Sequence, residues 1–376
     1  MKIIYIIILL WAGLFFDLEK TTVSVYFHAP VYETDSLKVR WEIVDFNDTI
    51  PNDTLFICEN EAGLIQFYFR KIHTGVCVNG ECRLLDIILY WTATGRYRGF
   101  SLPEGEFLSK TDHVPFKEED YRRLETILAN PYSVLGSYRI DQLTTAEPDM
   151  AVDAVSGATL LSVKEASVED AVYTTYTLWN LVYGSTQKEI RNYTAARLTD
   201  ELAAQILNSG DYHDKLWVLE NMGACLSWSE EFKALIIRKV SEMPDILAGQ
   251  ALSALPDSIL EEQSVQIPLV DHFKGLSYMS QRILLEKLER VSGLSSWVSG
   301  ALASHMPDLS ASVVDRILKL FVVQGVSAEE IGLQVAVLLE HKNRFIARRA
   351  YEYLEQQDLH DEKLNKLVRK YRSKNI

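Results

Sequence analysis

The chain has 376 residues, of which 48% are hydrophobic and 24% are charged, a composition that excludes a collagen-like, a disordered or a polytopic membrane protein. Its length is sufficient for two or three domains. With 38 Lys and Arg residues against 52 Asp and Glu residues, the net charge is −14, and the chain lacks the electrostatic footprint of a nucleic-acid-binding protein.

The N-terminus predicts export. Met1-Lys2 precedes the uncharged, apolar run Ile3–Phe16, which would span about 21 Å as a helix, less than the roughly 30 Å of a bilayer core. One basic residue before a short apolar run is typical of a secretory signal. We therefore expect residues 1–16 to be a signal peptide or an anchor, and the protein to be periplasmic or on the extracytoplasmic face of the membrane. The alternative is a buried first element.

Several segments of residues 17–197 have the pattern of strands or helices. Leu37–Ile43 alternates apolar and polar residues, which is typical of a half-buried strand. Three further segments are rich in β-branched and aromatic residues and predict strands at 22–28, 64–72 and 84–91. Apolar residues recur at helical spacing at Tyr121, Leu124, Ile127 and Leu128, and again over Val163–Val182. We expect an α+β domain.

The dipeptide Asn79-Gly80 predicts a β-hairpin, because a type I′ turn needs positive φ at both central positions. A turn centred there places Cys77 opposite Cys82 at a non-hydrogen-bonded pair, where Cα atoms approach to about 4.5 Å. That separation is at the short end of disulfide geometry. We expect a structural disulfide, with reduced thiols or a redox-active pair as alternatives. Two cysteines without a nearby His or Cys make a poor metal site.

The segment Asp153–Ser162 is the one that predicts chemistry. Locally, Ser156-Gly157 forms a turn, and Ser162 is expected to be a helix N-cap that completes a capping box with Glu165. Small residues before a helix leave backbone N–H groups open, and these groups together with the helix dipole favour a phosphate. The hydroxyl of Thr159 is a candidate for covalent attachment of a phosphoryl group. The alternative is a turn before a well-capped helix.

The run Asp-x-x-Ser-Gly-Ala-Thr, filled here by Asp153, Ser156, Gly157, Ala158 and Thr159, resembles the flavinylation motif of the FMN-binding domain family. This family includes the flavin-carrying subunits of sodium-pumping quinone reductases and related electron-transfer complexes. Ser162 matches a serine that is often found three residues after the motif. The resemblance implies that a flavin transferase joins FMN to Thr159 through a phosphoester, outside the cytoplasm.

The resemblance covers about residues 90–185. Gly95–Phe100 is loosely similar to the Gly-aromatic-Gly start of such domains, whereas Lys110–Phe116 departs from their pattern. His113 in the departing segment is a candidate for tuning the flavin or a structural loop residue. Three aromatic residues recur every three positions after the motif and either stack on the isoalloxazine or belong to the core: Tyr173, Tyr176 and Trp179.

Residues 198–376 contain a repeat with a period of 33 residues. Four columns of five apolar residues each keep this step, and they begin at Leu207, Val218, Leu219 and Met222. Each unit predicts two short helices, for instance 229–240 and 245–255, which cannot bury their apolar stripes alone and must stack. The ankyrin signature is absent, so we expect a HEAT-like α-solenoid of about five repeats. The basic end at 363–374 is expected on the polar face of a capping helix.

Together these features predict an α+β FMN-binding-like domain at 17–197 and an all-α HEAT-like solenoid at 198–376. We expect an exported electron-transfer flavoprotein whose partners are a flavin transferase and a redox protein, with a membrane contact only through the N-terminus. No catalytic residue, metal or nucleic acid is expected, and the solenoid is either a docking surface or a platform. The alternatives are a structural or interaction protein of the cell envelope without flavin, and a flavin-dependent enzyme acting on a small molecule.

Overall fold

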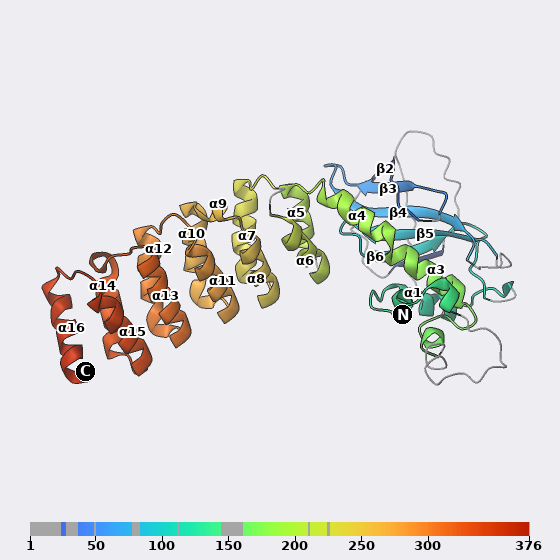
Figure 1. Ribbon diagram of the computed structural model, residues 1–376. Coiled ribbons are helices and arrows are strands. Elements are labelled where there is room, and N and C mark those ends of the chain that lie inside the picture. The colour runs from blue at the N-terminus through green and yellow to red at the C-terminus, as the bar shows by residue number, and fades with distance from the viewer. Residues whose placement is uncertain are drawn as a thin grey trace. The chain divides into compact units, whose positions relative to one another are not determined.

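The computed structural model describes residues 24–27, 37–48, 50–76, 83–110, 113–143, 161–209, 211–223 and 226–375. The chain divides into two compact units, Met1–Arg197 and Leu198–Ile376. In the first unit the described residues form an antiparallel sheet with a few helices, and in the second they form helices only (Figure 1). The α+β layout is therefore as expected.

Within the described residues, the sheet of the first unit has six strands in the order β1-β6-β5-β4-β3-β2. The strands are β1 Ser24–Phe27, β2 Lys38–Ile43, β3 Thr54–Glu59, β4 Ile65–Thr74, β5 Leu85–Thr92 and β6 Tyr97–Leu102. The strand predictions at 22–28, 37–43, 64–72 and 84–91 are confirmed, whereas β3 and β6 were not predicted. All six residues of β6 are buried, so this strand lacks the alternation that marks a half-buried strand.

The pairing of β4 with β5 fits the predicted hairpin. The last described pair of this ladder is Thr74 opposite Leu85, and these two positions are symmetric about Asn79-Gly80. Cys77 and Cys82 themselves lie outside the described residues, so the disulfide stays a prediction. Cys58 on β3 is a buried free thiol, and desolvation raises its pKa to about 12.

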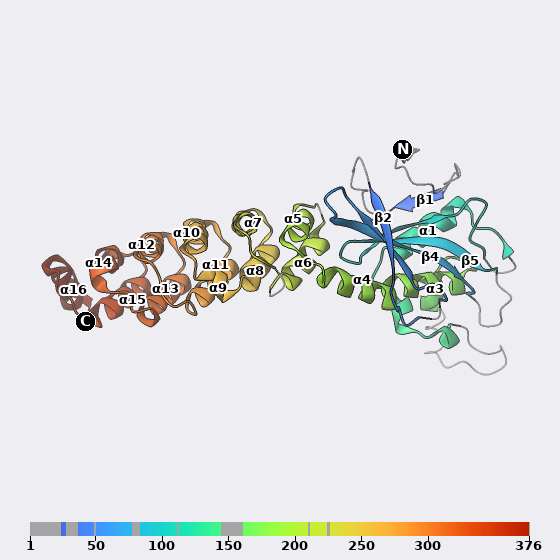
Figure 2. The ribbon, with the colours of Figure 1, turned by 90° about the horizontal axis from the view of Figure 1, so that it is seen from above.

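Helices cover one face of the sheet. Among the described helices, three belong to this layer: α1 Glu118–Leu128, α3 Val172–Tyr183 and α4 Ser185–Ala195. Figure 2 shows α3 and α4 along one side of the strands. Trp91 on β5 donates its indole N–H to the carbonyl of Val182 at 3.0 Å, and the hydroxyls of Tyr68 and Thr194 lie 2.6 Å apart. The buried residues of α1 are the four predicted from helical spacing.

The helix predicted over Val163–Val182 is interrupted. Residues 161–165 are helical, the chain turns at 166–171, and α3 begins at Val172. Asp170 has a φ of +58°, which ends helical geometry and which Asp tolerates. The hydroxyl of Ser167 donates to the carbonyl of Val163 at 2.7 Å, so a side chain competes with the helical backbone here. Ser162 therefore lies inside the short helix, and its predicted N-cap role in a capping box is wrong.

The second unit consists of helical pairs. The first helices of the pairs are α5 Asp200–Asn208, α7 Glu230–Glu242, α10 Gln263–Asp271, α12 Ser296–His305 and α14 Ala328–Val337. The second helices are α6 Tyr212–Asn221, α8 Asp245–Ala254, α11 Tyr278–Leu288, α13 Ala311–Val323 and α15 Arg344–Glu355. The short α9 Asp257–Leu260 precedes α10, and α16 Glu362–Asn375 follows the last pair. First helices contact the first helices of neighbouring pairs, and second helices contact second helices, so the pairs form two layers (Figure 1).

All twenty residues of the four apolar columns are buried, five in each. Leu252, Leu285 and Leu318 lie on the second helices α8, α11 and α13, as predicted. The same period sets the start of every second helix, a regularity that the apolar columns did not show. The N-cap residues are Asp211, Pro244, Ser277, Ser310 and Asn343, each 33 positions after the last.

A fifth column begins with four polar residues, and three of them join consecutive pairs. It starts at Asp200, whose carboxylate accepts hydrogen bonds from the backbone N–H groups of Ser227 at 3.1 Å and Ser229 at 2.7 Å. The next member, Lys233, donates to both carboxylate oxygens of Glu262 at 2.7 and 2.6 Å. Further along the stack, the hydroxyl of Ser299 donates to Glu330. These bonds link the first helix of one pair to the residues that begin or form the first helix of the next.

The last member of this column is Gly332 on α14. A Cβ there would lie 2.6 Å from Cδ2 of Leu364, so the absence of a side chain admits Leu364 of α16. Leu364 is the buried residue of α16, and the basic residues at 363–374 lie on this final helix. The position of α16 against α14 and α15 is that of the capping helix expected from the sequence.

Candidate functional site

The run Asp-x-x-Ser-Gly-Ala-Thr, in which the sequence predicts flavin attachment, lies between two described segments of the first unit. Asp153, Ser156, Gly157, Ala158 and Thr159 fall in residues 144–160, which are not among those the structure describes. The described segment before the motif ends at the buried residue Leu143, and the described segment after it begins with the helix at 161–165.

The described segments on the two sides of the motif contact each other. The hydroxyl of Tyr138 lies 3.3 Å from Oγ of Ser162. Arg123 on α1 donates to the carbonyl of Glu165, and Val163 is buried in the core. The helix layer therefore fixes both ends of the segment that carries the motif.

The aromatic residues of α3 hold the loop at 129–143. Trp179 is buried and donates its indole N–H to the carbonyl of Asn130 at 2.9 Å. The hydroxyl of Tyr176 donates to the carbonyl of Tyr138 at 2.9 Å. A Cβ on Gly136 would lie 2.6 Å from the Trp179 indole, so this glycine packs directly on the ring. Of the two interpretations of Trp179, the core residue is the one that the structure bears out, while Tyr173 is half-buried.

His113 lies at the tip of a narrow loop. The loop is closed by hydrogen bonds from the N–H of Lys110 to the carbonyl of Val114 and from the N–H of Phe116 to the carbonyl of Leu108, both at 2.8 Å. His113 is exposed and has a φ of +62°, as a turn residue does. Within the described ranges, no three His, Cys, Asp or Glu side chains are grouped so that they could hold a metal ion.

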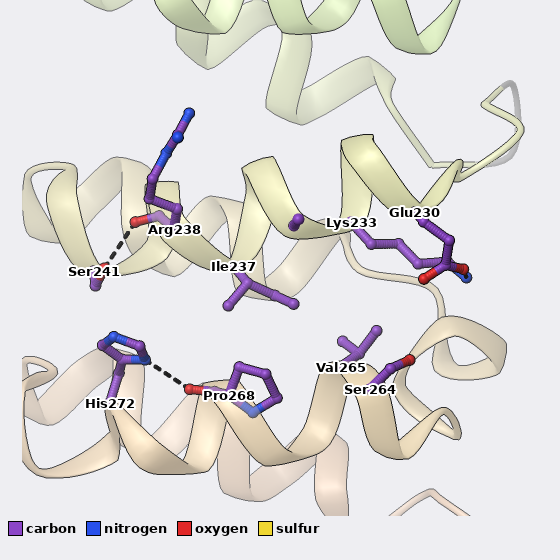
Figure 3. Close-up of a pocket in the computed structure, with 10 residues that line it drawn as sticks. Glu230, Lys233, Ile237, Arg238, Ser241, Ser264, Val265, Pro268 and His272 are labelled. Carbon is purple, nitrogen blue, oxygen red and sulfur yellow. Dashed lines mark hydrogen bonds and ion pairs between the residues drawn. The ribbon is translucent and has the colours of Figure 1, made fainter.

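A groove that sequence reasoning missed lies between α7 and α10 in the second unit (Figure 3). Its volume is about 310 Å³, and its middle is apolar, with Ile237 and Val265 facing each other across it. At one end Lys233 is held by Glu262 and, at 2.9 Å, by Glu230. The groove is therefore an apolar depression with an ion-paired cluster of one cation and two carboxylates at one end.

The other end of the groove contains Pro268 and His272. Pro268 lies inside α10, where it has no N–H to donate to the carbonyl of Ser264. Nδ1 of His272 lies 2.7 Å from the carbonyl of Pro268, and because a carbonyl only accepts, Nδ1 must carry the proton. A proline inside a helical pattern is the sequence signal that could have identified this groove.

No protein-family model, curated protein or solved structure matches the chain. Among the helices that the structure describes, none is both long and apolar enough to cross a bilayer. The motif at 153–159 and the geometry of the described residues are therefore what bears on function.

Proposed function

We propose that this protein is an exported electron-transfer flavoprotein that carries FMN on Thr159 through a phosphoester. The observation that carries the proposal is the motif itself, with Asp153, Ser156, Gly157, Ala158 and Thr159 filling every position of Asp-x-x-Ser-Gly-Ala-Thr. Its place supports the proposal, because the motif joins two segments that are fixed on the helix layer of an α+β unit.

The residue types of the motif suit the group. Thr159 would supply the hydroxyl whose Oγ bonds to phosphorus, as the phosphorus–oxygen bond to the leaving group of the activated flavin nucleotide used by the transferase breaks and the hydroxyl proton passes to a base. The small side chains of Gly157 and Ala158 would leave backbone N–H groups open to phosphate oxygens. Asp153 and Ser156 add a proton acceptor and a hydroxyl within six residues of Thr159. FMN, once attached, supplies one- and two-electron redox chemistry, and the protein supplies its attachment and surroundings.

The second unit is assigned as a HEAT-like solenoid of five repeats that docks a redox partner. The two layers of helices and the 33-residue spacing of the N-caps support this assignment. The groove between α7 and α10 provides an apolar contact site for such a partner. A cell-envelope interaction protein without flavin is the second candidate, because the groove and the helical layers suit it equally.

The test is co-expression of the full chain with a flavin transferase, followed by in-gel flavin fluorescence of the denatured protein. We expect a fluorescent band for the wild type, none for Thr159→Ala, and a partial signal for Thr159→Ser, which keeps a hydroxyl. Thr145→Ala removes a hydroxyl from the same segment but outside the motif, so it should keep the full signal.

Asp153→Asn should weaken labelling without abolishing folding, if the carboxylate serves the transfer step. A known substrate of the same transferase serves as the positive control. If that substrate is fluorescent and the wild-type band is dark, the interaction protein without flavin becomes the better explanation. Labelling that persists in Thr159→Ala would contradict the assignment of the attachment residue.

A further inference from the structure

The edge strand β2 presents its apolar side chains to solvent. Val39, Trp41 and Ile43 are 54%, 64% and 67% exposed. The alternation of Leu37–Ile43 predicts a half-buried strand whose apolar residues face the core. The strand is present, but its apolar residues face solvent, so the expected orientation is wrong. An exposed apolar row on an edge strand is a surface that proteins normally avoid unless it has a partner.

The charged residues of β2 face the helix layer and fix this orientation. Nε of Arg40 donates to Glu59 at 2.7 Å, and its Nη1 donates to the hydroxyl of Tyr193 on α4 at 2.8 Å. That hydroxyl donates to Glu42, and Arg197 stacks on the ring of Tyr193 at 3.6 Å. A shift of one residue would exchange the two faces of β2, so these contacts hold the apolar row outward.

The main chain of the same three residues faces the open edge. The N–H of Val44 donates to the carbonyl of Asp53 at 2.9 Å. Residues alternate along an antiparallel ladder, so even-numbered residues of β2 direct their main-chain groups toward β3. Val39, Trp41 and Ile43 direct theirs away from it, and among the described strands β2 has β3 as its only neighbour.

The apolar row continues across the sheet. Trp41 is opposite Phe56 of β3, which is opposite Phe69 of β4. The rings of Phe56 and Phe69 stack with centroids 4.6 Å apart. The surface at β2 is therefore the border of a wider aromatic face, on the side of the sheet opposite Tyr68 and Arg70.

We propose that two copies of this chain pair their β2 strands antiparallel, across a twofold axis at Trp41. This register places Arg40 opposite Glu42 of the partner subunit, and Val39 opposite Ile43 of the partner subunit, each twice. Trp41 meets Trp41 of the partner subunit. Opposite charges and apolar residues directly across a pair of strands stabilise it.

The symmetry of the segment is what favours a second copy over an unrelated strand. A twofold interface uses the same patch on both subunits and must be self-complementary, and 39–43 is complementary to its own reverse in charge and in apolarity. An unrelated strand imposes no such symmetry. Pairing would join the two sheets and their aromatic faces.

Sedimentation velocity of the full chain, over a dilution series in the micromolar range, tests this inference. We expect a dimer for the wild type and about tenfold weaker association for Trp41→Lys, because two like charges then meet at the axis. Tyr132→Lys removes an aromatic residue that is 85% exposed in the same unit and should dimerise as the wild type does. Circular dichroism establishes that each variant is folded.

Cysteine cross-linking tests the register. Residues that face each other at a hydrogen-bonded pair have Cα atoms about 5.5 Å apart, within disulfide range. Trp41→Cys should therefore form an intermolecular disulfide under mild oxidation, and Tyr132→Cys should not. A wild-type monomer throughout the series, a dimer that Trp41→Lys leaves unchanged, or a folded Trp41→Cys dimer without the cross-link would each overturn the proposal. Because these experiments need no flavin, their outcome is independent of Thr159.

Discussion

Strand β2 and the helical pairs both have a regular apolar pattern, and the structure uses the two patterns in opposite ways. In the second unit all twenty column residues point inward, whereas the three apolar residues of β2 point outward. A helix with one apolar stripe has to bury it, and each helical pair buries its stripe against its neighbours in the same way. An alternating strand has two distinct faces, and contacts from elsewhere in the chain decide which one is buried.

For β2 these contacts come from Tyr193, 153 positions along the chain from Arg40. The hydrogen bonds and charges that surround Glu42 outweigh its desolvation and lower the pKa of this carboxyl. The charged face of β2 is therefore the face that is bonded to the rest of the first unit. Periodicity therefore predicts which residues share a face, but only long-range contacts determine the direction of that face.

The largest loss of stability is expected for truncations in the apolar columns. Leu285→Ala should lower the free energy of unfolding by about 2–5 kcal/mol, because the residue is fully buried and leaves a cavity. Urea denaturation measures it. Leu333→Ala, which truncates a leucine that is 46% exposed, is the matched control and should cost clearly less. Equal costs would remove the distinction between column and surface positions.

The polar column should be the next most sensitive. Asp200→Ala should cost about 1–3 kcal/mol, because the backbone N–H groups of Ser227, Trp228 and Ser229 lose their acceptor. Asp211→Ala, which removes an N-cap acceptor from the neighbouring helix, should cost about 1 kcal/mol. Comparable losses for the two variants would show that the link between pairs is no stronger than a cap.

The pH dependence of Asp200 has a definite sign. Although desolvation opposes it, hydrogen bonding from Ser229 and Ser227 lowers the pKa of the Asp200 carboxyl from its ordinary value of 3.8. Its contribution to stability is therefore present above that value and is lost as the pH falls through the lower, folded-state pKa. Asp200→Asn should flatten the wild-type decline in unfolding free energy at acidic pH. An identical slope in both proteins would contradict the assignment.

The smallest loss of stability is expected at the hydrogen bonds that join Tyr193 to β2. Tyr193→Phe removes the hydroxyl shared by Arg40 and Glu42 and should cost about 0.5–1.5 kcal/mol. Hydrogen exchange should then become faster in β2 while that of β4 changes little. Unchanged exchange in β2 would mean that Tyr193 does not fix the strand.

Much of the fold follows from local patterns, and the exceptions have physical causes. The spacing of Tyr121, Leu124, Ile127 and Leu128 gave the buried face of α1, because that helix is amphipathic. β6 escaped prediction since it is buried on both faces and contains Arg98 and Gly99. The break before α3 depends on Ser167 and Asp170, whose side-chain bonding and positive φ no periodicity reveals.

In the candidate site, too, some features follow from the sequence and others depend on long-range packing. The motif at 153–159 was identified from its resemblance to the FMN-binding domain family, because the residue types alone left a turn before a helix as the alternative. The role of Trp179 required the structure, since stacking and core aromatics have the same spacing and are separated by burial and by contacts such as those with Asn130 and Gly136. The groove at Pro268 likewise depends on how α7 and α10 pack.

Peptide mass spectrometry after co-expression with a flavin transferase is the most direct test of FMN attachment at Thr159. Trypsin should release residues 140–164 as one peptide, since no Lys or Arg lies between Arg139 and Lys164. Fragmentation of this peptide separates Thr159 from Thr144, Thr145, Ser156 and Ser162. We expect an FMN phosphoester on Thr159 alone, and an unmodified peptide, or FMN on another hydroxyl, would contradict the proposed attachment.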